Sequence, residues 1–301
     1  MIMFASAITN YDTYERCAVP GLNLVRESDS AVLAHRSIGS LFRNYNFVLG
    51  EARKRADLEA LVLVHQDAEL VDPDFCQTVR EALRDPEVGL VGCAGAVGVR
   101  SIAWWEGGVT WAGFNHRYRE YGGGDLPAMT WDRDKIPPYV ATGEVDSIDG
   151  FVIVLSPWAV NEVEFDETIG DLHGYDFDLC CQVRAAGRKV VTADFRAIHH
   201  HSLDVINDPG GWKDSYVRMI EKWEGKLPNV QVTKDPRMHS LRSEAEAAYN
   251  RARVNMYVHK IEAIEGLIGE METSTSWRLT RPFRAIGRLF RRPRRREQPM
   301  L

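Results

Sequence analysis

Short apolar runs alternate with segments of helical periodicity along the first two hundred residues. The apolar runs, which we interpret as buried strands, occupy residues 2–9, 60–65, 88–94, 145–155 and 189–192. The helical segments occupy residues 37–55, 74–84 and 175–186; a further helix is expected to start at 14–17, and residues 21–33 are typical of a short strand with a loop. This alternation predicts an α/β fold with a mostly parallel sheet and helices on both faces.

The segment between residues 100 and 145 departs from this pattern. It contains three consecutive glycines, two consecutive prolines, and the tryptophans Trp104, Trp105, Trp111 and Trp131. We interpret it as a long irregular or hairpin-containing insertion, and insertions of this length are usually functional. The tryptophans could stack on sugar rings or simply pack the loop, and the pattern leaves both interpretations open.

Beyond residue 235 the chain becomes rich in Ala, Glu and Arg, which predicts a helical extension over residues 236–272. Its apolar residues are spaced alternately by four and three positions: Tyr257, Ile261, Ile264, Ile268 and Met271. This is the spacing of a seam along one helix face. One interpretation is a helix packed on its own domain; the other is a coiled coil that joins two copies as a homodimer.

The final segment, residues 273–301, is a basic tail. Residues 278–296 contain nine arginines and no acidic residue, so the net charge of −6 becomes −15 for the rest of the chain when these arginines are left out. In a helix over 277–296, one face is apolar and is formed by Leu279, Phe283, Ile286 and Phe290. The pattern is typical of a helix lying on an anionic membrane. A disordered basic end and a nucleic-acid patch are the alternatives, although we expect no nucleic-acid partner.

Composition restricts the environment of the protein. A chain of 301 residues with 45% hydrophobic residues can form a core without covalent or metal staples. Its five cysteines show no C-x-x-C spacing, which argues against a disulfide framework or a zinc knuckle and favours a reducing cytosol. No signal peptide is apparent, and no apolar run approaches the ~20 residues of a membrane span. We expect a cytoplasmic protein that is peripheral on the inner face of the cell membrane.

The first group with candidate chemistry is His65-Gln66-Asp67, directly after a buried strand. Ligands of open α/β sheets bind at the carboxyl ends of strands. A carboxylate at that position can hold a divalent cation, which in turn bridges the oxygens of a diphosphate. A solvated strand end is the alternative interpretation of the same residues.

Two further groups lie later in the chain. Asp176 and Asp178 start a predicted helix two positions apart, so they diverge by about 200° and only one can face a cleft. That one is a candidate base, and helix capping is the alternative. In the run of three histidines at 199–201, His199 and His201 share one face of an extended chain, and neutral imidazole is a common metal ligand.

Other catalytic machinery is missing from the sequence. There is no G-x-S-x-G elbow, no P-loop, and no G-x-G-x-x-G after the first strand. The usual marks of hydrolases, NTPases and dehydrogenases are therefore absent.

Taken in order, these segments resemble the family-2-like inverting glycosyltransferases of the GT-A fold, most closely a bacterial branch whose metal motif reads His-x-Asp. The resemblance covers about residues 3–203. The stretches that carry it are Ser37–Asp67, Val145–Leu155 with Asp149-Gly150-Phe151, and Phe165–Val191 with Gly174-Tyr175-Asp176-Phe177-Asp178-Leu179. It implies a Rossmann-like GT-A domain over residues 1–228, followed by the helical extension at 236–272 and the tail at 273–301.

The resemblance also implies roles for single residues. Asp176 is expected to be the catalytic base. The residues expected to bind the donor are Thr9, Asn10, Ser28, Asn46, His65, Gln66 and Asp67. Those expected at the acceptor or sugar are Trp111, Asp149, Gly150 and Tyr175. Mg²⁺ or Mn²⁺ is expected to be held by Asp67 and by a histidine of the run, with His201 preferred and His199 as the other candidate. The sequence departs from the family pattern at His65, which replaces the first acid of Asp-x-Asp, and at Tyr175, which replaces a Glu.

The implied mechanism is a direct displacement that inverts the anomeric carbon. Asp176 would deprotonate an acceptor hydroxyl as it attacks a nucleoside-diphosphate sugar, and the cation would stabilise the departing diphosphate. Residues 274–280 also resemble a segment found after bacterial surface-polysaccharide glycosyltransferase domains, so we expect a glycan or lipid-linked acceptor in surface polysaccharide or glycolipid synthesis. The alternatives are a catalytically inactive nucleotide-sugar- or glycan-binding relative, and a nucleotidyltransferase, although that class's Gly-rich basic amino-terminal loop is missing.

Overall fold

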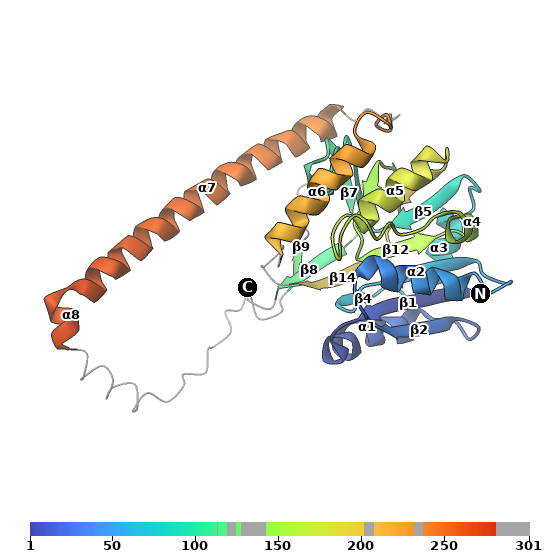
Figure 1. Ribbon diagram of the computed structural model, residues 1–301, viewed down its shortest axis with the longest axis horizontal. Coiled ribbons are helices and arrows are strands. Elements are labelled where there is room, and N and C mark those ends of the chain that lie inside the picture. The colour runs from blue at the N-terminus through green and yellow to red at the C-terminus, as the bar shows by residue number, and fades with distance from the viewer. Residues whose placement is uncertain (113, 119–124, 128–142, 202–207, 232–236, 281–301) are drawn as a thin grey trace. The chain divides into compact units, whose positions relative to one another are not determined.

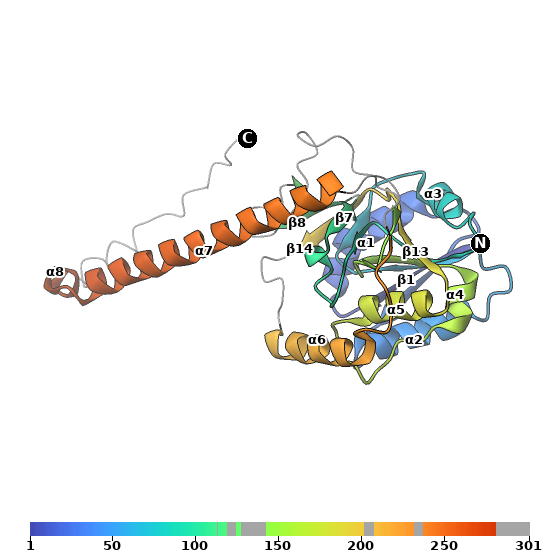
Figure 2. The same cartoon turned by 90° about the horizontal axis from the view of Figure 1, so that it is seen from above.

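The computed structural model describes the chain except residues 113, 119–124, 128–142, 202–207, 232–236 and 281–301. It forms two compact units, Met1–Ala245 and Glu246–Leu301. Figures 1 and 2 show that the first unit is an α/β domain, in which helices flank a central sheet.

A seven-stranded sheet forms the centre of the first unit, in the order β10-β13-β5-β12-β3-β1-β2. Its strands are β1 (Ile2–Ile8), β2 (Ala31–Arg36), β3 (Ala60–Val64), β5 (Val88–Gly92), β10 (Gly143–Glu144), β12 (Val152–Leu155) and β13 (Lys189–Thr192). The expected α/β architecture is confirmed. The sheet is mixed rather than mostly parallel, because β12 runs antiparallel to both β3 and β5, and β10 runs antiparallel to β13.

Helices cover both faces of this sheet. Figure 2 shows α1 (Tyr11–Val25) and α3 (Phe75–Ala82) on one side, with α2 (Leu41–Ala52), α4 (Pro157–Glu162) and α5 (Tyr175–Ala185) on the other. Every residue of the central strands β3, β5 and β12 is consequently buried. Burial on two faces explains why these strands are continuous apolar runs without alternation.

The first helix is longer than the sequence pattern predicted. It continues through Pro20 and Gly21 to Val25, where we expected the start of a short strand and loop. A Cβ atom at Gly21 would lie 2.4 Å from the backbone nitrogen of Leu70, so glycine lets α1 pack closely against β4 (Ala68–Leu70). Tertiary packing therefore overrides the weak local helix propensity of this stretch.

The rest of the first unit adds two small sheets, with the orders β11-β6-β7 and β4-β14-β8-β9. Their remaining strands are β6 (Ala94–Val97), β7 (Val109–Ala112), β8 (Phe114–Tyr118), β9 (Asp125–Pro127), β11 (Ser147–Ile148) and β14 (Ala197–His201). The single strand expected over 145–155 thus divides into β11 and β12. The histidine run forms a further strand, β14, after the strand that we expected to be the last.

The second unit is helical and contains most of α7 (Arg237–Thr273) together with α8 (Thr275–Leu279). Ser274 begins α8 as its N-cap, because its hydroxyl oxygen accepts the Trp277 N–H at 3.3 Å. The expected helical extension is confirmed. Most of the basic tail, including Phe283, Ile286 and Phe290, lies outside the described residues. None of the helices among the described residues combines the length and apolar character needed to cross a bilayer.

Candidate functional site

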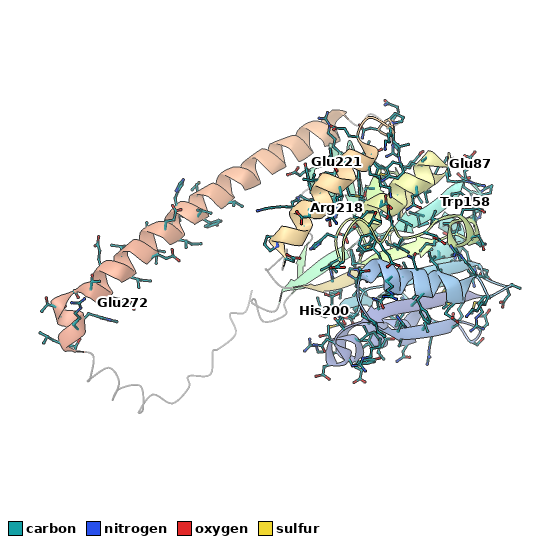
Figure 3. The ribbon with its side chains drawn as sticks, viewed as in Figure 1. Glu87, Trp158, His200, Arg218, Glu221 and Glu272 are labelled. Atoms are coloured by element: carbon teal, nitrogen blue, oxygen red, sulfur yellow. The ribbon has the colours of Figure 1, made fainter. Side chains whose placement is uncertain are left out.

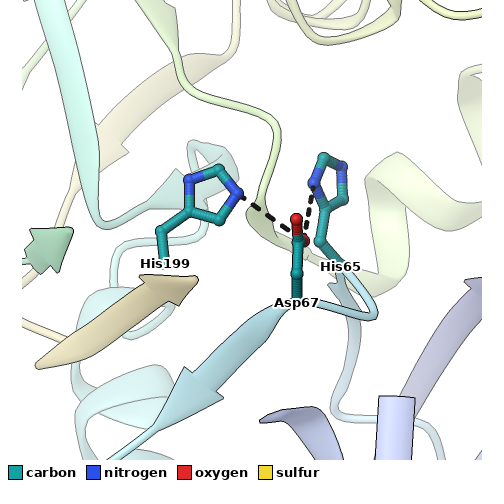
Figure 4. Close-up of side chains that lie close together, drawn as sticks. All are labelled: His65, Asp67 and His199. Carbon is teal, nitrogen blue, oxygen red and sulfur yellow. Dashed lines mark ion pairs between the residues drawn. The ribbon is translucent and has the colours of Figure 1, made fainter. Parts of the chain in front are cut away.

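Three side chains converge where β3, β4 and β14 meet (Figure 4). His65 and Asp67 occupy the turn from β3 to β4, which closes as the Ala68 N–H donates to the His65 carbonyl oxygen at 3.0 Å. His199 lies in β14, which pairs antiparallel with β4 and places His199 opposite Ala68. Asp67 Oδ1 lies 3.6 Å from His199 Nε2 and 3.9 Å from His65 Nδ1.

These three residues fit a divalent cation. One ligand atom from each lies within 4.8 Å of the other two. Two imidazole nitrogens and a carboxylate oxygen form a donor set that several divalent metals accept. Burial opposes the protonation of His199, but the hydrogen bond and charge of Asp67 outweigh it and raise the pKa of His199 above its usual value. The group therefore attracts positive charge.

The histidines of β14 face in different directions. His199 is buried and stacks on the ring of Phe151, with centroids 4.5 Å apart and planes at 5°. Nε2 of His200, a residue labelled in Figure 3, instead lies 2.8 Å from Oε2 of Glu69. The side chain of His201, which we expected to be the second metal ligand, lies outside the described residues.

The hydroxyl of Tyr175 lies 2.6 Å from His65 Nε2. The other ring nitrogen, Nδ1, faces Asp67. If the His65 Nε2–H donates to the Tyr175 oxygen, Nδ1 presents its lone pair toward a cation, which is how hydrogen bonds commonly orient metal-binding histidines. Burial raises the pKa of Tyr175 well above its ordinary value, so the hydroxyl stays neutral. Tyr175, which we expected at the acceptor, thus contacts a candidate metal ligand.

The tripeptide Asp149-Gly150-Phe151, directly before β12, supports three different parts of the site. Asp149 Oδ2 accepts the indole N–H of Trp104 at 2.9 Å. A Cβ atom at Gly150 would lie 2.0 Å from the hydroxyl oxygen of Tyr175, so only glycine leaves room for that side chain. The ring of Phe151 stacks on the imidazole of His199 in β14. The first two were expected at the sugar or acceptor, and the structure places both beside the candidate site.

Asp176 lies in the first turn of α5, directly after Tyr175. The helix begins after Gly174, whose φ of 87° is in the left-handed region that favours glycine. Asp176 is partly buried, and its Oδ1 accepts the Phe177 N–H at 2.9 Å. Burial, helped by the negative charge of Asp149, raises the pKa of Asp176 to about 7. A carboxyl group that titrates near neutrality is suited to accept a proton.

Asp178, two positions later, has a structural partner instead. It is buried, and its Oδ1 accepts the indole N–H of Trp223 at 2.7 Å and lies 2.8 Å from Lys222 Nζ. Both partners belong to α6 (Pro209–Trp223). Asp178 therefore fastens α6 to α5, and Asp176 is the acid of this pair that can face a substrate.

Three of the expected donor-binding residues are joined at the same edge of the sheet. Gln66 Oε1 accepts the backbone N–H groups of Thr9 and Asn10, both at 2.9 Å, and its Nε2 donates to Thr9 Oγ1 at 2.8 Å. The amide thereby links the carboxyl ends of β1 and β3. Thr9 and Asn10 are exposed, next in the chain to the strand edge that carries the candidate metal group.

Of the remaining expected residues, the structure does not bring Asn46 or Ser28 to this group. The side-chain amide of Asn46 is bonded to the backbone of Phe165 on both sides, at 2.8 Å each, and so holds α2 to the segment before α5. Ser28 lies in the exposed turn between α1 and β2. Because α1 returns the chain to the amino ends of the strands, Ser28 is at the opposite edge of the sheet, and we leave it out of the site. Trp111 is in β7, and its side chain lies outside the described residues.

The mixed sheet with helices on both faces is similar to that of GT-A glycosyltransferase structures. The sequence family described as glycosyltransferase-like matches residues 3–208. The chain therefore belongs to this glycosyltransferase-like family.

Two named proteins are similar to this chain in sequence. Streptomycin biosynthesis protein StrF of Streptomyces griseus is 28% identical over 206 residues, which cover 67% of each chain. O-antigen biosynthesis protein RfbC of Myxococcus xanthus is 28% identical over 180 residues, which cover 56% of this chain but only 13% of RfbC.

Two solved structures are similar to this chain at low sequence identity. The structure of GalNAc-T7 with UDP, GalNAc and Mn²⁺ is 10% identical with a TM-score of 0.50, covering 82% of this chain and 54% of that one. The mannosyltransferase PcManGT from Pyrobaculum calidifontis, in complex with GDP-Man and Mn²⁺, is 12% identical with a TM-score of 0.43, covering 96% and 86%.

Proposed function

We propose that this glycosyltransferase moves a sugar from a nucleoside-diphosphate sugar to an acceptor hydroxyl with inversion at the anomeric carbon. One observation carries the proposal: Tyr175 contacts His65 of the candidate metal group, and the next residue in the chain is Asp176. A group that can neutralise a diphosphate and a carboxyl that can accept a proton are thereby held together. These are the two functions that direct glycosyl displacement requires.

Asp176 acts as the general base in this proposal. Its Oδ atom takes the proton of the acceptor hydroxyl while the hydroxyl oxygen bonds to the anomeric carbon. The bond from that carbon to the donor's phosphate oxygen breaks, and the nucleoside diphosphate leaves with the electron pair. A single displacement inverts the configuration. Base assistance of this kind is typically worth ~10²–10⁴-fold in rate.

His65, Asp67 and His199 would hold a divalent cation, which when bound supplies a Lewis acid for the diphosphate oxygens. We favour Mn²⁺ over Mg²⁺, because two of the three donors are imidazole nitrogens and Mg²⁺ prefers oxygen ligands. The Mn²⁺ and UDP of the GalNAc-T7 structure support this choice. The exposed edge formed by Thr9 and Asn10 would receive the nucleotide.

We place the acceptor among glycans or lipid-linked glycans of surface polysaccharide or glycolipid synthesis. The similarity to an O-antigen biosynthesis protein supports this choice. The proposed division of the chain assigns catalysis to residues 1–228, a helical extension to 236–272, and attachment to an anionic membrane to the basic tail at 273–301. A peripheral position on the inner face of the cell membrane would bring the enzyme to a lipid-linked acceptor.

The proposal is tested with purified full-length protein, a panel of UDP-, GDP- and dTDP-sugars, and Mn²⁺. We expect transfer to water or to an added acceptor, with inversion seen by NMR of the fresh product, and a loss of about a hundredfold or more in Asp176→Asn. Donor affinity should remain close to wild type in that variant, because neutralising the base leaves ground-state contacts intact. Retention of configuration would contradict the mechanism. Donor binding without turnover would identify an inactive relative, and pyrophosphate release a nucleotidyltransferase.

A further inference from the structure

An apolar seam follows α7 from Val254 to Met271. Its members, spaced alternately by three and four positions, are Val254, Tyr257, Ile261, Ile264, Ile268 and Met271. Each is between 44% and 59% exposed. A continuous row of large apolar side chains in water is unfavourable and marks a surface that binds a partner.

The seam has the seven-residue repeat of a coiled coil. In heptad notation the a positions are the β-branched residues Val254, Ile261 and Ile268, and the d positions are Tyr257, Ile264 and Met271. The b and f positions, which face away from the seam, are polar or small: His259 and Glu262 lie there, joined by an ion pair at 3.2 Å, as do Gly266 and Gly269. A heptad repeat predicts a left-handed supercoil. Val and Ile at a favour two strands when Leu fills d, but here Tyr, Ile and Met fill d, so the apolar repeat by itself does not set the number of strands.

We propose that the partner is a second copy of this chain, and that residues 254–271 form a two-stranded parallel coiled coil. In a parallel pair, a g residue lies beside the e residue five positions later on the other helix. Lys260 is at g and Glu265 is at e. Lys260 therefore meets Glu265 of the partner subunit, and the reciprocal pair forms by symmetry. The surface is thus complementary to itself in charge as well as in shape.

The charge of this segment argues against a membrane as the occupant. Residues 254–273 contain four glutamates and a single lysine. A helix that lies on an anionic leaflet carries lysines and arginines around its apolar face, whereas these glutamates would be repelled. In a pair of copies, Glu265 instead forms an ion pair with the partner's Lys260.

The first test measures the oligomeric state of the full-length protein by sedimentation equilibrium. We expect a dimer in the wild type and an increase of about a hundredfold or more in the dissociation constant of Ile264→Asp, which places a charge in the seam. Met256→Asp is the matched control, because Met256 is 57% exposed but occupies the outer c position. It should dimerise like the wild type. Far-UV circular dichroism of both variants checks that the catalytic unit stays folded.

The second test exchanges the charges. Lys260→Glu and Glu265→Lys each create two repulsive contacts and should weaken the dimer by about tenfold at low salt. The double variant restores opposite charges and should recover wild-type affinity. A monomeric wild type, a trimer or tetramer, or a double variant weaker than either single one would overturn the proposal.

Discussion

The hydroxyl oxygen of Tyr175 lies 2.6 Å from Nε2 of His65, and this contact joins the first turn of α5 to the end of β3. Because Asp176 follows Tyr175, one helical turn supplies both the proposed base and the support for a proposed metal ligand. The position of the base and the orientation of His65 are therefore coupled. Variants that move Tyr175 should change both.

Tyr175→Phe removes only the hydroxyl. We expect Mn²⁺ affinity, measured by electron paramagnetic resonance with the metal alone, to fall about tenfold or more, because partners that orient a ligand typically contribute 10–100-fold. The melting temperature should change little. Tyr216→Phe, which removes a hydroxyl from α6, is the control. Unchanged Mn²⁺ affinity in Tyr175→Phe would show that the hydroxyl does not position His65.

Gly150→Ala tests the packing beneath Tyr175. The added Cβ would lie 2.0 Å from the hydroxyl oxygen, so the tyrosine must shift. We expect activity to fall by more than tenfold and Mn²⁺ affinity to fall with it. Tyr175→Phe does not relieve this clash, because the ring atoms Cζ and Cε2 would still lie 2.5 and 2.9 Å from the added Cβ. Wild-type activity and Mn²⁺ affinity in Gly150→Ala would contradict this account.

Asp176 should make stability depend on pH in an unusual direction. Its pKa is raised from 3.8 to about 7 in the folded protein, so the folded state holds this proton more tightly than the unfolded state. Stability is therefore lost as pH rises from about 4 to 7. Asp176→Asn removes the free-energy cost of ionising this carboxyl, so it should raise the free energy of unfolding by ~2 kcal/mol at pH 8 and hardly change it at pH 4. The expected gain is smaller than the full pKa shift implies, because the group is partly exposed.

The matched control for this measurement is Asp178→Asn. It breaks the buried ion pair with Lys222 and should lower the melting temperature at pH 8, the opposite sign from Asp176→Asn. The rate of transfer by the wild type should also fall below pH 7, because a base must be deprotonated to act. Equal melting temperatures for wild type and Asp176→Asn at pH 8 would argue against a raised pKa.

The histidine run allows a direct choice between metal ligands. We expect His199→Ala and Asp67→Ala to weaken Mn²⁺ binding by about a hundredfold or more, since each removes one of three protein ligands. His200→Ala should have little effect, because this side chain faces Glu69. His201→Ala tests the expectation from sequence that His201 is the second metal ligand. A loss of Mn²⁺ affinity in His201→Ala with none in His199→Ala would assign the ligand to His201.

The basic tail should bind anionic vesicles. Each arginine near such a surface contributes about 1 kcal/mol, so even half of the nine would give adhesion that weakens with salt. We expect the full-length protein to sediment with phosphatidylglycerol-containing liposomes at low salt, and a chain ending at Glu272 to remain in solution. The shortened chain keeps residues 254–271, so loss of self-association cannot explain the difference. Equal sedimentation of both chains would assign the tail another role.

Much of the fold could be predicted because buried strands are short apolar runs with polar ends. The strand Lys189–Thr192 was predicted with its bounds. The direction of β12 was not, since a run that is buried on both faces shows no alternation and carries no sign of orientation. The length of α1 was also underestimated, because Gly21 is explained only by the approach of Leu70.

The candidate site could likewise be predicted from the sequence only in part. His65 and Asp67 could be proposed from their place after a strand, and Asp176 from its place at a helix start. The contacts of Gln66 with Thr9, and of Tyr175 with His65, depend on segments that are far apart in the chain. Spacing within one segment therefore suggests which side chains are chemically suitable, whereas only the fold shows which of them meet.

The antiparallel β12 also has a consequence for how the protein folds. It pairs with strands from the first part of the chain, and its pairing positions Phe151, on which His199 stacks. The candidate metal group can thus form only after long-range sheet pairing, which is a slow class of folding event. Bound cation would consequently stabilise the native state alone, and the unfolding temperature should rise with the logarithm of one plus its concentration divided by its dissociation constant. Thermal unfolding across a Mn²⁺ titration would therefore report on completion of the sheet.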